Sequence, residues 1–418
     1  MTRLAKRLIF SFISLIFILC LTLIYLPLFS VSSQPSSKQI VTEIRGVWLT
    51  NVASGVLFVP WGIDRAINQL SALHFNTIYP VVWNRGNTFY KSEVAKSIIG
   101  SETEPVLNFM HGGQDVLDKL IKLAKPKGLT VIPWFEYGLM TPPNSKLVKL
   151  YPDWLTVGQQ GVDSIKASLP EENNGATSKQ AWLNPLHPQV QEFILGLILE
   201  VVSRYNVDGI QLDDHFGMPV QFGYDRFTVQ LYQQEHQGKS PPKNPYNSEW
   251  MRWRADKITA FMGRIYRSIK EIDPNAKLSL SPNAQAFAYK YYLQDWDTWV
   301  KNGWVDELVL QVYRHNKNSF MAELEQPAVK FAQSKIPVVV GISTGTLRTP
   351  VRISQIKEQI DIVRDRSFVG MSFFYWESLW GYISPEAPHK RRRIFSELFQ
   401  AKAIRPLPVG EEGGRLRL

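Results

Sequence analysis

The feature that most constrains this chain is an eightfold alternation of short apolar runs with stretches of helical spacing. Each run is rich in Val, Ile and aromatic residues, and each is followed by a polar break. The runs are continuously apolar, as expected for parallel strands covered on both faces. They predict eight strands, at Ile44–Asn51, Thr77–Asn84, Thr130–Tyr137, Gly209–Asp214, Lys277–Asn283, Glu307–Arg314, Pro337–Thr344 and Val369–Glu377.

Apolar residues at helical spacing follow each of these strands. The expected helices are Ile63–Leu73, Asp115–Lys125, Pro188–Tyr205, Ser248–Ile272, Asp295–Asn302, Met321–Gln333, Ser354–Asp365 and Lys390–Phe399. With 44% hydrophobic and 20% charged residues, the chain can bury a large core. We therefore predict an α/β protein, a single (β/α)₈ TIM barrel over residues 43–400.

Two connections between the predicted elements are unusually long. One follows the third strand, from Gly138 to His187, and the other follows the fourth, from His215 to Asn247. Both leave the carboxyl ends of strands, where barrel enzymes keep their active sites. Loops of this length in a compact domain are often functional.

The N-terminal segment differs from the rest of the chain. Basic residues including Arg3 precede an uncharged apolar run from Leu8 to Val31. About 20 apolar residues suffice to cross a bilayer, so residues 1–31 are interpreted as a membrane anchor or a signal peptide. Residues 32–42 follow as a linker, and the body is expected to be extracytoplasmic, in the periplasm or cell envelope, with the membrane as a partner.

Composition narrows the remaining classes. The only cysteine, Cys20, lies inside the apolar run, so the body is expected to fold without an internal disulfide. The formal net charge is +10, but the sequence shows no basic-aromatic module for binding nucleic acid. No nucleic-acid partner is therefore predicted. Residues 401–418, which include three glycines, are expected to form a disordered tail.

Acids and aromatics are concentrated at the predicted strand ends. The candidate catalytic residues are Asp213, Asp214 and Glu136. Glycoside hydrolysis needs two carboxyl groups together with aromatic faces that hold the sugars. The candidate substrate-binding residues are Trp48, Trp83, Trp134, His215, Asn283, Gln311, Tyr313, Trp376 and Glu377.

Adjacent residues of a strand point to opposite faces, so Asp213 and Asp214 can share the barrel mouth only if the strand ends between them. The alternative is a structural pair that caps the following turn. A rim salt bridge is the alternative for Glu136, and a structural partner is the alternative for Glu377. Because the histidines lack a metal-ligand spacing, neither a metal nor another cofactor is predicted.

Three segments together resemble the family-ten-like glycosyl hydrolases of bacterial envelopes. They are Arg45-Gly46-Val47-Trp48-Leu49-Thr50, Trp182-Leu183-Asn184-Pro185 with His187-Pro188, and Asp208-Gly209 leading to Asp213-Asp214. The resemblance covers about Glu43 to Phe399 and implies a barrel glycosidase, some members acting on peptidoglycan glycan strands. The chain departs from the family at Asn184, usually aspartate, and at His215, often tyrosine.

A second comparison is with chitinase-type barrels, whose fourth strand ends in Asp-Gly-x-Asp-x-Asp-x-Glu. Here Gln211 replaces an aspartate and His215 replaces the catalytic glutamate, which disfavours that mechanism. A barrel amidase or deacetylase would need a metal or an activated nucleophile, and the sequence offers neither.

These observations lead to two hypotheses. In the preferred one, the protein is a glycoside hydrolase acting on an extracytoplasmic polysaccharide. Asp213 or Asp214 is its nucleophile or base, and Glu136 is its general acid beside the apolar wall of Trp134 and Phe135. The alternative is a catalytically inactive carbohydrate-binding barrel that serves as an envelope tether or scaffold.

Overall fold

A computed structural model describes most of the chain, namely residues 41–160, 180–346, 348–380 and 384–406. The predicted signal or anchor segment 1–31, most of the predicted linker and residues 407–418 lie outside the described residues. Among the described residues, no helix is both long and apolar enough to cross a membrane.

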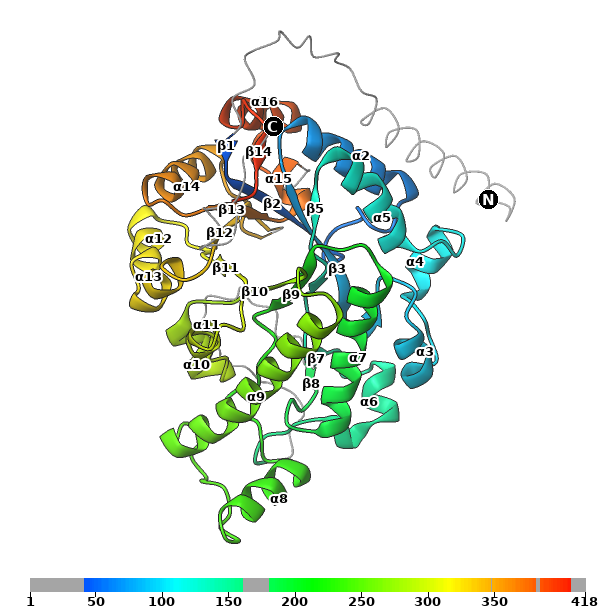
Figure 1. The fold of residues 1–418 in the computed structure, drawn as a ribbon, viewed down its shortest axis with the longest axis vertical. Helices are drawn as coiled ribbons and strands as arrows, with labels where there is room; N and C mark the ends of the chain where they lie inside the picture. Colours follow the sequence, from blue (N-terminus) through cyan, green and yellow to red (C-terminus); the bar gives the residue numbers. More distant parts are fainter. Residues whose placement is uncertain (1–40, 161–179, 347, 381–383, 407–418) are drawn as a thin grey trace, which may run out of the picture. The chain divides into compact units, whose positions relative to one another are not determined.

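Eight strand positions form a closed parallel barrel, as predicted (Figure 1). Each strand pairs with the next, and the pairing of β2 with β3 is part of the same closed ring. In chain order the strands are β2 (Ile44–Leu49), β3 (Thr77–Asn84), β5 and β6 (Thr130–Val131 and Trp134–Phe135), β9 (Gly209–Asp213), β10 (Lys277–Ser281), β11 (Glu307–Gln311), β12 (Val338–Ser343) and β13 (Gly370–Phe374).

The third barrel strand is split by Pro133. A proline has no backbone N–H and cannot donate to the ladder, so the predicted strand divides into β5 and β6. The strand still follows its neighbours, because the Ile132 N–H donates to the Ile78 carbonyl and the Pro133 carbonyl accepts from Gln211. The barrel therefore stays closed at the strand that leads to Glu136.

Outer helices cover the barrel and correspond to the predicted ones. They are α2 (Pro60–Ala72), α5 (Val116–Ala124), α7 (Pro188–Arg204), α9 (Ser248–Ile272), α11 (Trp296–Lys301), α12 (Lys317–Leu324), α13 (Pro327–Gln333), α14 (Ile353–Asp365) and α16 (Pro388–Leu398). The sequence predicts one helix where α12 and α13 lie. Pro327 disfavours helical geometry at the residue before it, so the helix is broken there.

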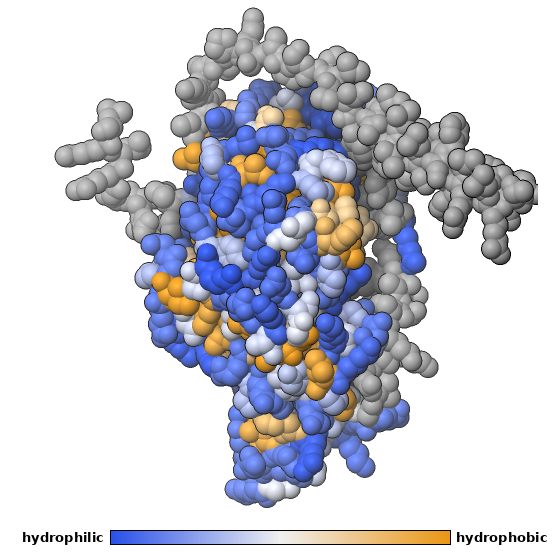
Figure 2. Space-filling view, turned by 90° about the vertical axis from the view of Figure 1, so that its right-hand side faces the viewer, coloured by the Kyte–Doolittle hydropathy of each residue, from blue (hydrophilic) through white to orange (hydrophobic). Residues whose placement is uncertain are grey.

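The outer surface of these helices is mostly polar. The face shown in Figure 2 is largely hydrophilic, with apolar residues in small separate patches. Buried apolar side chains of strands and helices instead form one continuous cluster. A core of this kind holds the strand ends in fixed positions relative to one another.

Short additional elements lie in the connections. In and around the connections after the first three strands are β4 (Asn87–Thr88), α3 (Glu93–Ile99), α4 (Pro105–Met110), the 3-10 helix Lys125–Lys127, β7 (Met140–Thr141), α6 (Lys146–Leu150), the 3-10 helix Pro152–Trp154 and β8 (Ala181–Trp182). Later connections hold α8 (Arg226–Glu235), α10 (Gln285–Tyr292) and α15 (Trp376–Trp380).

The C-terminal boundary differs from the prediction. Residues 401–406, expected to belong to a disordered tail, include β14 (Ala403–Ile404), which pairs with β1 (Val41–Thr42) in the predicted linker. Arg405 then reaches the strand-start end of the barrel, where its guanidinium donates to Thr77 at 2.7 Å and pairs with buried Glu307. A two-residue strand has no periodicity, so the sequence pattern did not reveal it.

Candidate active site

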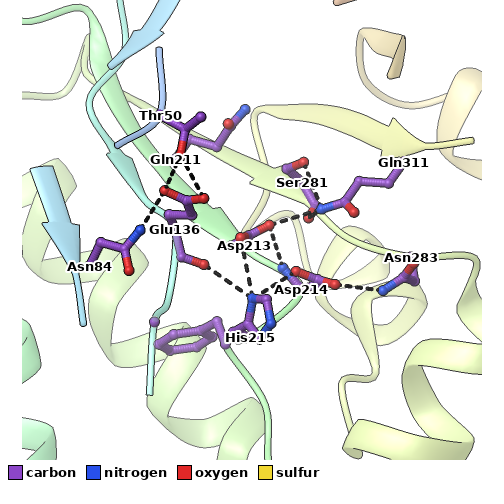
Figure 3. A network of polar contacts seen from close by, with 12 residues as sticks. Thr50, Asn84, Glu136, Gln211, Asp213, Asp214, His215, Ser281, Asn283 and Gln311 are labelled. Carbon is purple, nitrogen blue, oxygen red and sulfur yellow. Dashed lines mark hydrogen bonds and ion pairs between the residues drawn. The ribbon is translucent and has the colours of Figure 1, made fainter. Parts of the chain in front are cut away.

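The candidate site lies where β6 and β9 to β11 end. Figure 3 shows the Glu136 carboxyl on one side, with Thr50 and Asn84 around it. Asp213 and Asp214 lie on the other side, near Gln311, Ser281 and Asn283. The site gathers residues from separate strands because the carboxyl ends of parallel barrel strands meet at one face.

Glu136 follows β6 and is 5% exposed. The Thr50 hydroxyl lies 2.8 Å from both of its carboxyl oxygens, and the Asn84 side-chain amide donates to one of them at 2.6 Å. Burial raises the pKa of Glu136 to about 7, although these two donors act in the opposite direction. The alternative for Glu136, a rim salt bridge, does not form among the described residues, where the direct partners of the carboxyl are the neutral Thr50 and Asn84.

Asp213 is the last residue of strand β9, and Asp214 is the first residue after it. β9 ends at Asp213 and Asp214 belongs to the following turn, so the strict alternation of side chains stops between them. Asp213 accepts from the Gln311 amide at 2.9 Å and from the Asp214 backbone N–H at 2.8 Å. Asp214 accepts from Asn283 at 2.7 Å. Both carboxyls therefore lie on the same side of the barrel.

His215 connects the two acidic groups. Its Nδ1 lies 3.0 Å from an Asp214 oxygen, 3.4 Å from an Asp213 oxygen and 3.1 Å from the Glu136 carbonyl. Gly138 makes this approach possible, since its φ is +50° and a Cβ there would meet the His215 carbonyl oxygen at 2.9 Å. A side chain at position 138 would push the two loops apart.

The pKa values of the acid pair and the histidine diverge. Burial and then the Asp214 charge raise the pKa of Asp213 well above its usual range. Burial also opposes ionisation of Asp214, but the charge and hydrogen bond of His215 outweigh it and lower the Asp214 pKa. His215 in turn has a raised pKa, because the charge of Asp214 and the neighbouring hydrogen bonds overcome desolvation. An ionised Asp214 beside a protonated His215 is the arrangement that these shifts favour.

Asp213, Asp214 and His215 are also the described residues with the spacing of a metal site. One possible ligand atom from each lies within 4.8 Å of the others. In this structure their acceptor atoms are already engaged with Gln311, Asn283 and one another. Hydrogen bonds and ion pairing thus account for the position of each side chain.

Among the predicted substrate-binding residues, His215, Asn283 and Gln311 contact the acids directly. Tyr313 is half-buried and its ring is stacked on Phe374, with ring centroids 5.5 Å apart. Burial and then the charges of Asp213, Asp214 and Glu136 raise the pKa of Tyr313, which places its hydroxyl in the field of all three acids. These four residues belong to the candidate site.

Two of the predicted tryptophans have structural positions instead. Trp83 is fully buried, donates its indole N–H to the Gly138 carbonyl at 2.8 Å and packs on Phe193. Trp48 is 1% exposed and donates to Gln211 at 2.7 Å inside the barrel. Both rings are used in packing inside the barrel, so these positions give no support to the predicted role as substrate contacts, which stays a prediction. Strand position alone did not distinguish the barrel interior from its mouth.

Trp134, Trp376 and Glu377 have intermediate positions. Trp134 is 3% exposed and packs against Trp48, and its indole N–H has no partner among the described residues. Trp376 is 5% exposed and packs edge-on against Trp380. Burial raises the pKa of Glu377 to about 7, against hydrogen bonds from Ser54 and nearby backbone N–H groups. Glu377 therefore holds the connection after β2, which is a structural role.

No role was predicted for Thr50 or Asn84, although both donate directly to Glu136. Each lies at a predicted strand end, and that position was the only signal available. The Asn184 departure has a structural explanation, because its amide donates to Asp225 at 3.0 Å and to Thr228 at 2.8 Å. Asn184 thus holds the start of α8 and does not contact the acids.

Comparisons with known proteins agree with this fold. The family model described as Glycosyl hydrolase-like 10 matches residues 43–363. Glycosyl hydrolase DigH of Escherichia coli (strain K12) is 23% identical over 329 residues, which are 68% of each chain. Glycosyl hydrolase YngK of Bacillus subtilis (strain 168) is 23% identical over 308 residues, 65% of this chain and 54% of that protein.

Solved structures show the same barrel. The PgaB (BpsB) glycoside hydrolase domain from Bordetella bronchiseptica has a TM-score of 0.62 at 13% identity, covering 88% of this chain and 100% of that one. Alpha-L-fucosidase isoenzyme 2 from Paenibacillus thiaminolyticus has a TM-score of 0.60 at 14% identity, covering 85% and 49%. With the family match over most of the barrel, the chain belongs to the glycosyl hydrolase-like 10 family and is a glycoside hydrolase.

Proposed function

We propose that this glycoside hydrolase cleaves an extracytoplasmic polysaccharide by a two-carboxylate mechanism, with peptidoglycan glycan strands as the first candidate substrate. The observation that carries the proposal is the opposite direction of two pKa shifts at one barrel face. The pKa of Glu136 is raised to about 7 and that of Asp214 is lowered. When the pKa values of two carboxyl groups differ in this way, one group can donate a proton while the other is ionised.

Glu136 is the general acid in this proposal. With a pKa of about 7, it keeps its proton below neutral pH and in about half of the molecules at pH 7, and can pass it to the leaving oxygen. The Thr50 and Asn84 hydrogen bonds fix the orientation of its carboxyl. They also stabilise the carboxylate that remains after the proton has left.

Asp214 is the nucleophile or general base, because His215 and Asn283 favour its ionised form. Asp213 supports it as a positioning residue: it accepts the Asp214 backbone N–H and lies 3.4 Å from His215 Nδ1. In a retaining enzyme Asp214 would attack the anomeric carbon, and in an inverting enzyme it would activate a water molecule. The anomer of the first product, read by NMR, separates the two routes.

The proposed location rests on the N-terminal segment. The basic residues before Leu8 and the apolar run up to Val31 are the pattern of an exported protein. Peptidoglycan is a glycan that such a protein would meet outside the membrane. Protease treatment of intact cells tests the location, and a body that is digested only after the cytoplasm is opened would contradict it.

The activity test follows new reducing ends released from peptidoglycan glycan strands and other envelope polysaccharides. We expect Glu136→Gln and Asp214→Asn to lower the rate about 10²–10⁴-fold while the fold and glycan binding persist. Asp256→Asn is the matched control, since Asp256 is an exposed acid on α9 that pairs with Arg252. Equal rates in wild type and both variants would exclude these residues as the catalytic acids. A wild type that binds glycans but cleaves none of the panel would favour the scaffold hypothesis.

A further inference from the structure

The turn between β3 and β4 holds an arginine in an unusual backbone conformation. Asn84 pairs with Asn87 across a two-residue turn, in which Arg85 has φ +53° and Gly86 has φ +76°. Turns with two positive φ values favour Asn, Asp and Gly, because a larger side chain is strained there. The chain thus has an arginine where backbone preference selects against it, and such a position often has a function.

The Arg85 side chain lies against Tyr137, beside the site. Its guanidinium carbon is 5.9 Å from the centroid of the Tyr137 ring, and its Nε is 3.5 Å from the Tyr137 hydroxyl. The Tyr137 ring in turn lies 5.7 Å from the His215 ring. Arg85 is exposed, and its two terminal nitrogens have no hydrogen-bond acceptor in the part of the chain that the structure describes.

Arg85 is close to the acids without pairing to any of them. Asn84, the preceding residue, donates to Glu136 at 2.6 Å, and the positive charge of Arg85 is one of the influences that lower the pKa of Glu136. The direct contacts of the Glu136 carboxyl are nevertheless with Thr50 and Asn84. No described carboxylate lies within ion-pair distance of Arg85. With no described acceptor, this exposed guanidinium can bind an anion carried by a glycan in the site.

We propose that Arg85 binds a carboxylate on the sugar unit next to the bond being cleaved, so that the enzyme prefers carboxylate-bearing glycans. Arginine suits this group because its planar fork matches two carboxylate oxygens at once. Contact with Tyr137 engages the Nε edge and leaves the terminal nitrogens without an acceptor among the described residues. The inference rests on the proposed function, since it names a group on the substrate of the same site.

The test compares two substrates that differ in one group. These are peptide-free peptidoglycan strands, which carry lactyl carboxylates, and the same strands after reduction of the carboxylates to alcohols. Arg85→Asn removes the cation and suits the positive φ, so it should fold at least as well as the wild type. Arg85→Lys keeps the charge and loses the fork. Arg393→Ala, at an exposed arginine on α16, is the control.

Assays at about pH 5.5 keep Glu136 protonated and ordinary carboxylates charged. We expect the wild type to have about tenfold lower KM and Kd for the carboxylate strands than for the reduced strands. Arg85→Asn should treat both alike, with kcat nearly unchanged, and Arg85→Lys should lie between. High salt should weaken the wild-type preference. The Arg393 control should behave as the wild type.

The two failures are distinguishable. A wild type that cleaves neither preparation contradicts the proposed function on these strands, while its Kd values for the two preparations still test Arg85. A wild type with no preference, or an Arg85→Asn protein that keeps it, overturns the inference. If inorganic phosphate or sulfate inhibits only the enzymes that retain Arg85, and the two strand preparations are treated alike, the site binds another anion and the carboxylate assignment is wrong.

Discussion

Buried acids at the two ends of the barrel have different partners. At the end where strands begin, Glu307 is paired with Arg405, and Glu43 contacts both Arg45 and Arg364 at 2.7–2.8 Å. At the end where strands finish, Glu136 accepts its direct hydrogen bonds from neutral Thr50 and Asn84. No described arginine forms an ion pair with the acids of the candidate site. Arginines thus pair with Glu43 and Glu307 where the strands begin, whereas Glu136 has no described cation and Asp214 pairs only with His215 where they end.

The pKa values follow this difference. Burial opposes ionisation of Glu43, but hydrogen bonds from Arg364 and Arg45 lower its pKa, so the ionised group stabilises the fold above about pH 4.5 and this contribution is lost as the pH falls. Glu136 has a raised pKa of about 7. Its ionisation therefore costs stability as the pH rises, and the cost is complete above pH 7. Arginine partners thus favour the ionised form of Glu43, whereas burial favours the protonated form of Glu136.

The largest change in unfolding free energy is expected where the barrel strands begin. Arg405→Met leaves the buried Glu307 carboxyl without its cation, which should cost about 3–5 kcal/mol of unfolding free energy. Urea denaturation followed by tryptophan fluorescence measures it. The double variant Arg405→Met/Glu307→Gln removes both charges and should recover much of the loss. If Arg405→Met were as stable as the wild type, the end of the barrel where the strands begin would not depend on the Arg405–Glu307 pair.

A change of opposite sign in unfolding free energy is expected at Glu136. Glu136→Gln removes a carboxyl that is costly to ionise, so the variant should gain roughly 2 kcal/mol of stability at pH 8. At pH 5 the wild-type carboxyl is protonated, and the difference should nearly vanish. Glu43→Gln is the matched comparison and should be destabilised at pH 8. Thermal unfolding measures the stability of both variants at the two pH values. A change of the same sign in both variants at pH 8 would contradict the comparison.

The smallest effect concerns the fine adjustment of Glu136. Asn84→Ala removes a donor that favours the ionised carboxyl, so the pKa of Glu136 should rise by about half a unit to one unit. A general acid must be protonated, and activity should therefore fall at a correspondingly higher pH than in the wild type. The pH profile of kcat/KM measures the shift. Asn302→Ala, at an exposed residue after α11, should leave the profile in place.

The elements that could be predicted were those with long local patterns. α9 has its predicted bounds, Ser248–Ile272, because a long amphipathic helix repeats its signal over many turns. β3 likewise has its predicted bounds, Thr77–Asn84, as a continuous apolar run. The split at Pro133 and the two-residue strand β14 were missed, since neither contains a repeating pattern.

The acids could be found at strand ends because parallel strands bring their carboxyl ends to one face. Their partners could not be found in this way. Thr50 and Asn84 are ordinary polar residues until the barrel places them against Glu136. Trp48 and Trp83 resembled sugar platforms, but depth within the barrel decides whether a ring is exposed, and that depth is not encoded in the local spacing.

The sequence by itself determined the barrel, its order of strands and the positions of Glu136, Asp213 and Asp214, because hydrophobic periodicity is a local property. The tertiary structure alone decided which acids have cations. Arg405 contacts Glu307 across 98 residues, whereas no cation of the described residues forms an ion pair with Glu136. Charge pairing and burial set these pKa values, and both exist only after distant strands have closed into one barrel.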